Sequence, residues 1–199
     1  MFVLETMTLL RTFRGSGTMY RDNSLMPKEA VRLAVLGTLT QAGSLRYADL
    51  AGAIRHFTSR IVGPSLDLMG TSLELLRYDG LIEALDGTGM EDNAVLTVTP
   101  AGKKEFETLM RSNVRAPSSD DLNKLIITLK LRFLHLLEHQ DRQDQIDLLA
   151  DLYETELARL QDLRRHHDGE AGYLTEWLDH DIAQVEARLR WFQDLYQRT

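Results

Sequence analysis

The segment HLLEH, residues 135–139, carries side chains at a spacing that could bind a metal ion. It matches the H-x-x-E-H pattern of inverted zinc peptidases. His135 and His139, four residues apart, would share one face of a helix, and Glu138 could act as the base. Such enzymes also need a distant third ligand and a large enclosing fold, whereas this segment falls in a small helical region. We therefore expect no metal site here.

The run RRHH, residues 164–167, is the second candidate for metal binding. It ends a predicted helix, where cationic side chains stabilise the helix dipole, and we interpret it in that role. The sequence shows no Ser/His/Asp constellation and no glycine loop for phosphate, and GTG at 87–89 is typical of a turn. We therefore predict a protein that is not an enzyme and needs no cofactor. A zinc hydrolase is the least favoured class, and a measurement of metal content would dispose of it.

A short helix is predicted after Pro64, and its outward face is acidic. Helical spacing places Met69, Leu73 and Leu76 on the core-facing side. No Lys or Arg occurs from Pro64 to Leu76. The side chains expected to point away from the core are Asp67, Thr71, Glu74 and Tyr78, flanked by Leu68 and Leu75. Glu74 could accept a hydrogen bond from a cytosine amino group. The alternative is that this face is simply solvated.

The residues that we expect to contact DNA lie on this helix and near it. Hydroxyl groups at Ser65, Thr71 and Ser72 could hydrogen-bond phosphate, and Thr71 could also read a base. The flanking positions supply positive charge and one tyrosine: Arg46, Tyr47, Arg55, Arg60 and Arg77. Phosphate contacts from such positions fix orientation without reading sequence. Ordinary surface solvation is the alternative for each of them, as it is for Lys103 and Lys104.

The elements that position these residues follow the order of a winged helix-turn-helix. Apolar residues recur at helical spacing over residues 27–41, 45–57 and 100–111, as they do after Pro64. Alternating β-branched residues on either side of the turn DGTG predict two strands, GLIEAL and AVLTVTP. The order helix–helix–helix–hairpin–helix therefore predicts a winged helix. The acidic-faced helix is its third helix and the hairpin is its wing.

The second half of the chain has a helical pattern without a strand signal. Beyond a short linker at 113–119, apolar residues are spaced by three and four over residues 119–139, 144–167 and 173–197. The last two segments, joined by the turn HDGEAG, would pair antiparallel. Such a thin layer buries too little surface on itself, so a second copy is the expected partner. The predicted homodimerisation residues are Ile146, Leu149, Tyr153, Leu157, Leu178, Ile182, Leu189 and Phe192.

Charge is unevenly distributed along the chain. The 199 residues carry a net charge of −7, which argues against a protein that coats nucleic acid by bulk electrostatics. Residues 113–199 hold eleven Lys and Arg against seventeen acids, whereas residues 1–26 hold three Arg against two acids. A DNA-facing surface must therefore be a local patch in the first half.

We predict a mainly α protein in three parts: an N-terminal arm over residues 1–26, a winged helix-turn-helix domain over 27–112 and an all-helical dimerisation domain over 119–199. The arm is polar and rich in Gly and Ser, so we expect it to be flexible. Alternatively, Met26 is the natural first residue. Without cysteines, a signal peptide or an apolar run of about 18 residues, a cytoplasmic location away from membranes is expected.

Five motifs occur in one order along residues 27–199: AVLGTL, LRYADLAGAI, LLRYDGLIEA, LTVTPAGKKEF and YLTEWLDHDIAQVEARLRWFQDL. Together they resemble the PadR-type transcriptional regulators, in the long AphA-like variant with a helical C-terminal domain. The resemblance implies a dimeric regulator that responds to a ligand or to stress. It also implies a third helix that enters the major groove and a wing that lies along the DNA backbone.

The third helix and the wing depart from the family pattern. A tyrosine that is common in the family falls on Gly70, and its two arginines fall on Glu74 and Leu75. The wing, EALDGTGMEDNAVLTV, contains no basic residue. The family's DNA contacts therefore do not transfer residue by residue.

We predict a homodimer that places two third helices in successive major grooves of a pseudo-palindromic operator, with an effector that shifts their spacing. Trp177 and Trp191 share nearly one face of the last helix and are expected to pack in the core or the dimer. Alternatively, they line a pocket for a small aromatic effector. The alternative function is a protein–protein interaction module, which has lost sequence-specific DNA binding and docks a partner protein through Leu68 and Leu75.

Overall fold

The computed structural model describes residues 24–63, 70–86, 93–115 and 120–199. The elements are α1 (Pro27–Ala42), β1 (Ser44–Arg46), α2 (Tyr47–Val62), α3 (Gly70–Tyr78), β2 (Ile82–Ala84), β3 (Val95–Val98), α4 (Pro100–Arg111), α5 (Asp121–Phe133), the 3₁₀ turn η1 (Leu134–Leu136), α6 (His139–His166) and α7 (Leu174–Arg198). None of the described helices is long and apolar enough to cross a lipid bilayer. The predicted mainly α class and winged helix-turn-helix are confirmed.

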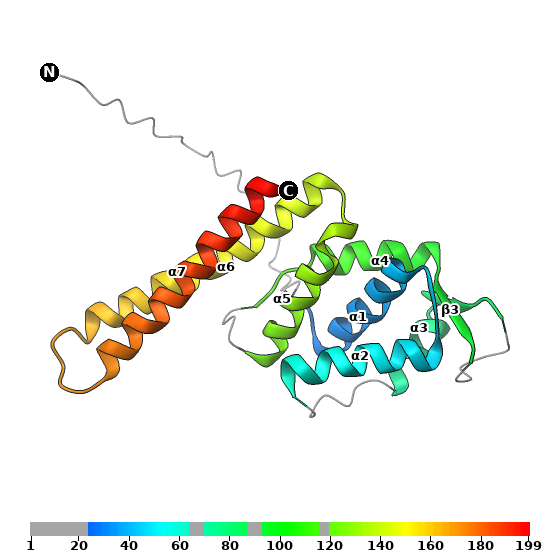
Figure 1. The fold of residues 1–199 in the computed structure, drawn as a ribbon, viewed down its shortest axis with the longest axis horizontal. Helices are drawn as coiled ribbons and strands as arrows, with labels where there is room; N and C mark the ends of the chain where they lie inside the picture. The colour runs from blue at the N-terminus through cyan, green and yellow to red at the C-terminus, as the bar shows by residue number, and fades with distance from the viewer. Residues whose placement is uncertain (1–23, 64–69, 87–92, 116–119) are drawn as a thin grey trace, which may run out of the picture.

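Helix α1 lies at the centre of the winged helix. Pro27 occupies its first position, where a missing N–H does no harm, and Gly43 ends it at a positive φ of 81°. Apart from Arg32, every residue from Ala30 to Leu39 is buried. Figure 1 shows α1 surrounded by α2, α4 and α5, and it packs on all three. The uncharged motif AVLGTL is therefore a helix segment that is covered on all sides.

The sheet has three antiparallel strands in the order β1–β3–β2. β2 and β3 form the predicted wing hairpin, with Ile82 opposite Val98. Strand β1 was not predicted, because the pattern from Leu45 onward was interpreted as helix. Instead, Ser44–Arg46 pairs with β3, with Leu45 opposite Leu96, and α2 begins at Tyr47. A strand of three residues is too short to show a periodicity of its own.

The motif TPAG fastens α4 to the end of α3. The Thr99 hydroxyl accepts a hydrogen bond from the Gly102 N–H at 3.0 Å, which caps the helix, and donates to the Gly80 carbonyl at 2.7 Å. A β-carbon on Gly102 would lie 2.0 Å from the Leu81 carbonyl oxygen. Glycine is therefore required here by the close approach of two backbone segments.

Helix α5 packs directly on α1 through another glycine contact. A β-carbon on Gly37 would lie 2.4 Å from two ring carbons of Phe133, so the phenyl ring occupies the space that a side chain would fill. Phe133 is fully buried and meets Phe106 of α4 edge to face, with ring centroids 6.1 Å apart. The first helix after the linker thus shares its core with the winged helix.

The helix expected over residues 119–139 ends early, at Phe133. The 3₁₀ turn η1 follows, and α6 begins at His139 after an extended Glu138. The prediction was wrong because the leucines of this corner continue the apolar pattern while the chain turns. His135 and His139 consequently do not share a helix face. Within the described ranges, no cluster of three or more His, Asp or Glu side chains could hold a metal ion.

Helices α6 and α7 form an antiparallel hairpin that projects away from the winged helix (Figure 1). Inside it, the rings of Tyr153 and Phe192 stack with centroids 5.5 Å apart. Nearer the turn, Arg164 donates to Asp179 through Nε at 2.8 Å. The hairpin is therefore held together within a single chain, as the pairing predicted from sequence requires.

Candidate nucleic-acid interface

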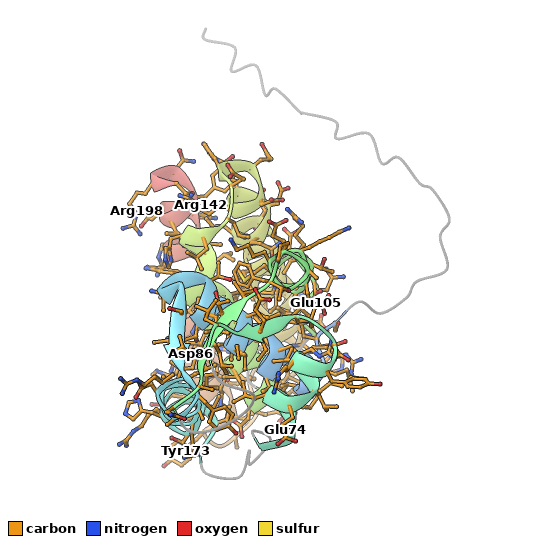
Figure 2. The ribbon with its side chains drawn as sticks, turned by 90° about the vertical axis from the view of Figure 1, so that its right-hand side faces the viewer. Glu74, Asp86, Glu105, Arg142, Tyr173 and Arg198 are labelled. Carbon is orange, nitrogen blue, oxygen red and sulfur yellow. The ribbon has the colours of Figure 1, made fainter. Side chains whose placement is uncertain are left out.

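Helix α2 presents the predicted basic residues at its surface. Arg46 caps the helix, and its side chain and those of Arg55 and Arg60 are exposed. Tyr47 is half-buried against the core, and its N–H donates to the Ala94 carbonyl at 2.9 Å. Figure 2 shows nitrogen-tipped side chains projecting from α2 away from the body of the molecule. Three of these four residues are thus available to a ligand, while Tyr47 also anchors α2 to the wing.

Helix α3 buries one face and exposes the other, as its spacing predicts. Leu73 and Leu76 are 1% and 0% exposed, whereas Leu75 and Tyr78 are 55% and 90% exposed. Glu74, at the lower edge of Figure 2, is exposed as well. Arg77 is exposed and engaged in an interaction within the chain. The outward face therefore combines one carboxylate with two large side chains of low polarity.

Three predicted hydroxyl contacts cannot be placed. Ser65 lies outside the described residues, as do Asp67, Leu68 and Met69. Thr71 and Ser72 lie in the first turn of α3, but their side chains are likewise outside what is described. Their proposed contacts with phosphate and bases remain predictions.

The end of α3 is fixed by ion pairs with the core helices. Arg32 of α1 donates to Asp79 at 2.5 Å and lies 3.7 Å from Glu105 of α4. The Leu81 N–H donates to the Leu76 carbonyl at 2.9 Å, which closes the turn after the helix. These contacts set the direction of α3, and sequence reasoning did not assign Arg32 this role. Its isolated charge in a buried apolar run was the available signal.

The wing is acidic where it is described. Glu83 is exposed on β2. Asp86 accepts a hydrogen bond from the Val95 N–H at 2.9 Å, so this carboxylate helps to close the hairpin. Glu91 and Asp92 lie outside the described residues. The wing thus supplies no described cation for a DNA backbone.

Unpaired cations concentrate on the winged helix. Most Lys and Arg side chains of the second half are used within the chain: Lys124 with Asp121, Arg164 with Asp179, Arg165 with Asp162 and Arg190 with Glu186. In the described residues, seven cationic side chains make no hydrogen bond, ion pair or ring contact, and six belong to residues 27–112: Lys28, Arg46, Arg55, Arg60, Lys103 and Lys104, with Arg159 the seventh. The protein is acidic overall, yet six of these seven cations lie in the first half of the chain, where the charge distribution predicts any DNA-facing surface.

The predicted dimerisation residues all lie on α6 and α7. Five of the eight are buried within one chain: Ile146, Leu149, Tyr153, Leu178 and Phe192. Leu157, Ile182 and Leu189 are half-buried. Trp177 and Trp191 are 61% and 45% exposed, so neither packs in the core of a single chain.

A buried lysine at the base of the hairpin escaped sequence reasoning. Lys130 of α5 is 0% exposed, and its Nζ donates to the Met110 carbonyl and to Gln145 Oε1. Burial lowers the pKa of Lys130 to about 7. Its position four residues after Ile126 and three before Phe133, on the apolar face of α5, was the signal that could have found it.

Comparison with known proteins assigns the chain to a family. Residues 20–196 match the family model described as "Putative AphA-like transcriptional regulator". The curated proteins provide no match. In a comparison of structures, Bacillus subtilis PadR in complex with operator DNA is 17% identical, with a TM-score of 0.36 over 85% of this chain and 97% of that one.

Two further structures align at similar levels. PadR in complex with p-coumaric acid has a TM-score of 0.38 and 17% identity, over 87% of this chain and 97% of that one. The protein smu.1604c from Streptococcus mutans UA159 has a TM-score of 0.35 and 19% identity, over 82% and 96%. The family assignment rests on the sequence match, which spans most of the chain and includes all five motifs. The chain belongs to the family of AphA-like transcriptional regulators.

Proposed function

We propose that this protein is a homodimeric, sequence-specific DNA-binding regulator. Two copies would place their α3 helices in successive major grooves of a pseudo-palindromic operator. In this proposal Arg46, Arg55 and Arg60 bind phosphates beside the groove, and Tyr47, Ser65, Thr71, Ser72 and Arg77 complete the contact surface. The membership in a family of transcriptional regulators supports the proposal.

The observation that carries the proposal is the local concentration of free cations. Exposed cations with no partner in the described structure lie at the start of α2 and along it, whereas the described outward face of α3 carries the Glu74 carboxylate. Counterion release by such side chains provides affinity for DNA without sequence information. This arrangement explains how α3 could enter a groove although Glu74 is its only described ionised outward residue before Arg77.

The α6–α7 hairpin is the proposed dimerisation element. Leu157, Ile182 and Leu189 are half-buried in one chain, and Leu163 and Leu174 near the turn are each 42% exposed. Burying these apolar surfaces against a second copy would stabilise a symmetric dimer. Residues such as Leu149 then act indirectly, by holding the hairpin together.

We also propose that the dimer responds to a small aromatic effector. Trp177 and Trp191 expose indole surface on α7, and Trp191 meets Phe192 edge to face with centroids 5.1 Å apart. Aromatic rings that remain exposed on a helix could stack with a planar ligand. Such a ligand would act by favouring one spacing of the two winged helices.

Fluorescence anisotropy with DNA from the protein's own promoter region tests the proposal. We expect binding at low salt that is tighter than binding to random DNA and that weakens steeply as salt rises. Arg55→Ala and Arg60→Ala should each reduce the slope of log K against log salt by about 1. Arg165→Ala, near the hairpin turn and 3.0 Å from Asp162, is the matched control and should leave the slope unchanged. Equal affinity for promoter and random DNA at low salt would refute sequence-specific binding.

The exposed leucine and tyrosine of α3 favour a second candidate, a protein-docking module. Leu75 and Tyr78 beside Glu74 form an outward surface that could bind a partner protein. The same titration separates the two functions, because a docking module would show no salt-dependent affinity for DNA at all.

A further inference from the structure

A buried amine lies among the contacts between the base of the α6–α7 hairpin and the winged helix. Lys130 of α5 donates to the Met110 carbonyl in the last turn of α4 and to Gln145 Oε1 of α6, the latter at 2.7 Å. Gln145 is itself 3% exposed. Lys130 therefore links α4, α5 and α6 in a place that water does not reach.

The hydrogen bonds around this amine suit its uncharged form. A neutral amine has two N–H groups, and the two acceptors match them. A protonated amine has three, and the described structure provides no third acceptor for it. The buried charge would then also be left without a counter-ion. The junction can accommodate a protonated amine only if it rearranges or admits water.

Two charged groups of the converging helices, Arg111 and Arg132, are engaged elsewhere. Arg111 at the end of α4 forms a bidentate pair with Asp141 of α6 and also lies 3.5 Å from Glu107. Arg132 of α5 lies over the rings of Phe57 and Phe133.

Two further charged groups near the start of α6 also have partners. Arg142 donates to the Leu137 carbonyl, and Asp144 accepts from Gln140. From α1, Arg32 is paired with Asp79 and Glu105. None of these groups forms an ion pair with Lys130.

We propose that Lys130 is a positioning residue for DNA binding: its uncharged amine holds the α6–α7 hairpin in a fixed orientation to the winged helix, and protonation of the amine releases that hold. Because the proposed dimer pairs the hairpins, this orientation sets the spacing of the two α3 helices. Operator affinity would then fall as the solution becomes more acidic near neutral pH. The fall in operator affinity rests on the proposed function, whereas the change in hairpin orientation does not.

A distance measurement within one chain tests the orientation directly. The protein has no cysteine, so Ala53→Cys on α2 and Ala187→Cys on α7, both exposed, allow two spin labels to be attached. Labelled chains are diluted into unlabelled protein so that only distances within one chain are measured. We expect a narrow distance distribution at pH 8 and a broader or shifted one at pH 6. An unchanged distribution between these pH values would overturn the proposal.

Gln145→Glu separates proton sensing from ordinary packing. The added carboxylate keeps an acceptor in place and provides the missing counter-charge, so the amine stays protonated and paired throughout. The distribution should then be independent of pH between 6 and 8. Lys130→Met, which cannot be protonated, should also lose the pH response. If both variants respond to pH like the parent protein, the proposal is wrong.

The exposed imidazoles of His135 and His139 lie near the junction, so the experiment needs a control for them. The measurements are therefore repeated with both replaced by Gln, and the pH response should persist. Where promoter DNA binds, affinity should fall by up to about tenfold per protomer from pH 8 to 6, relative to Lys130→Met. If the protein binds no DNA, the distance measurement still decides the role of Lys130.

Discussion

The contact between Gly37 and Phe133 makes a prediction that opposes helix propensity. Alanine is favoured over glycine inside a helix by about 1 kcal/mol, so Gly37→Ala would ordinarily stabilise α1. Here the new β-carbon would lie 2.4 Å from Phe133 Cδ2 and Cε2. Carbon atoms pack at about 3.5 to 4.0 Å, so the ring or α1 would have to move by at least about 1 Å. Phe133 is fully buried against Phe106, which leaves it little room.

We expect the packing effect to win. Overpacking of a well-filled core costs about 1 to 3 kcal/mol, against the gain of about 1 kcal/mol from propensity. Gly37→Ala should therefore destabilise the protein by about 1 kcal/mol. For a protein of this size, the melting temperature should fall by about 2 to 4 °C. Circular dichroism during urea and thermal unfolding, at one fixed protein concentration, measures the change.

Gly52 provides the matched control. It lies inside α2, and nothing lies within 4 Å of the position that its β-carbon would take. Gly52→Ala should therefore stabilise the protein by up to about 1 kcal/mol. If both substitutions stabilise the protein equally, α5 does not pack on α1 as described. In that case the change in stability caused by Gly37→Ala should be the same in the parent protein and in a Phe133→Leu background.

Two further predictions concern folding stability. Lys130 is neutral in the folded protein above pH 7 but protonated in the unfolded chain up to about its ordinary value of 10.5. The unfolded chain therefore binds more protons in this window, and the free energy of unfolding should rise by about 2 kcal/mol from pH 7 to 9. Urea unfolding at each pH should show this rise in the parent protein and not in Lys130→Met. If stability depends on pH in the same way in both proteins, Lys130 is not a buried amine without a counter-ion. Thr99→Val should cost about 1 to 2 kcal/mol because it removes the cap of α4, whereas Thr99→Ser should keep most of the stability in the same assay.

The local sequence pattern was sufficient to predict the winged helix, but it predicted neither strand β1 nor the end of α5. The apolar positions of α1, α2 and α4 repeat every three or four residues, and the wing alternates around a turn, so both could be identified. Strand β1 exists because Ser44 pairs with Thr97, far along the chain. The end of α5 could not be predicted either, because the buried residues Leu134 and Leu137 fit a continuing helix and a buried turn equally well.

The sequence predicted which basic residues of the candidate interface are exposed, but not which basic residues form ion pairs. Arg55 and Arg111 both look like exposed basic residues on an amphipathic helix. Only the fold brings Arg111 to Asp141, where the carboxylate raises the pKa of the guanidinium further, and leaves Arg55 without a partner. The same limit applied to Lys130, whose role depends on acceptors in two other helices. Burial and charge pairing are set by residues distant in sequence, which periodicity does not report.

The central position of α1 has a consequence for synthesis on the ribosome. Helix α1 ends at Ala42, but α5, which covers one of its sides, ends only at Phe133. At about 5 to 20 residues per second, the apolar surface around Gly37 emerges roughly 5 to 20 seconds before its last partner is made. During that interval the nascent chain would present the uncharged segment AVLGTL to the cell. The protein is thus expected to depend on chaperones that bind nascent chains, and chains stalled before α5 should be degraded.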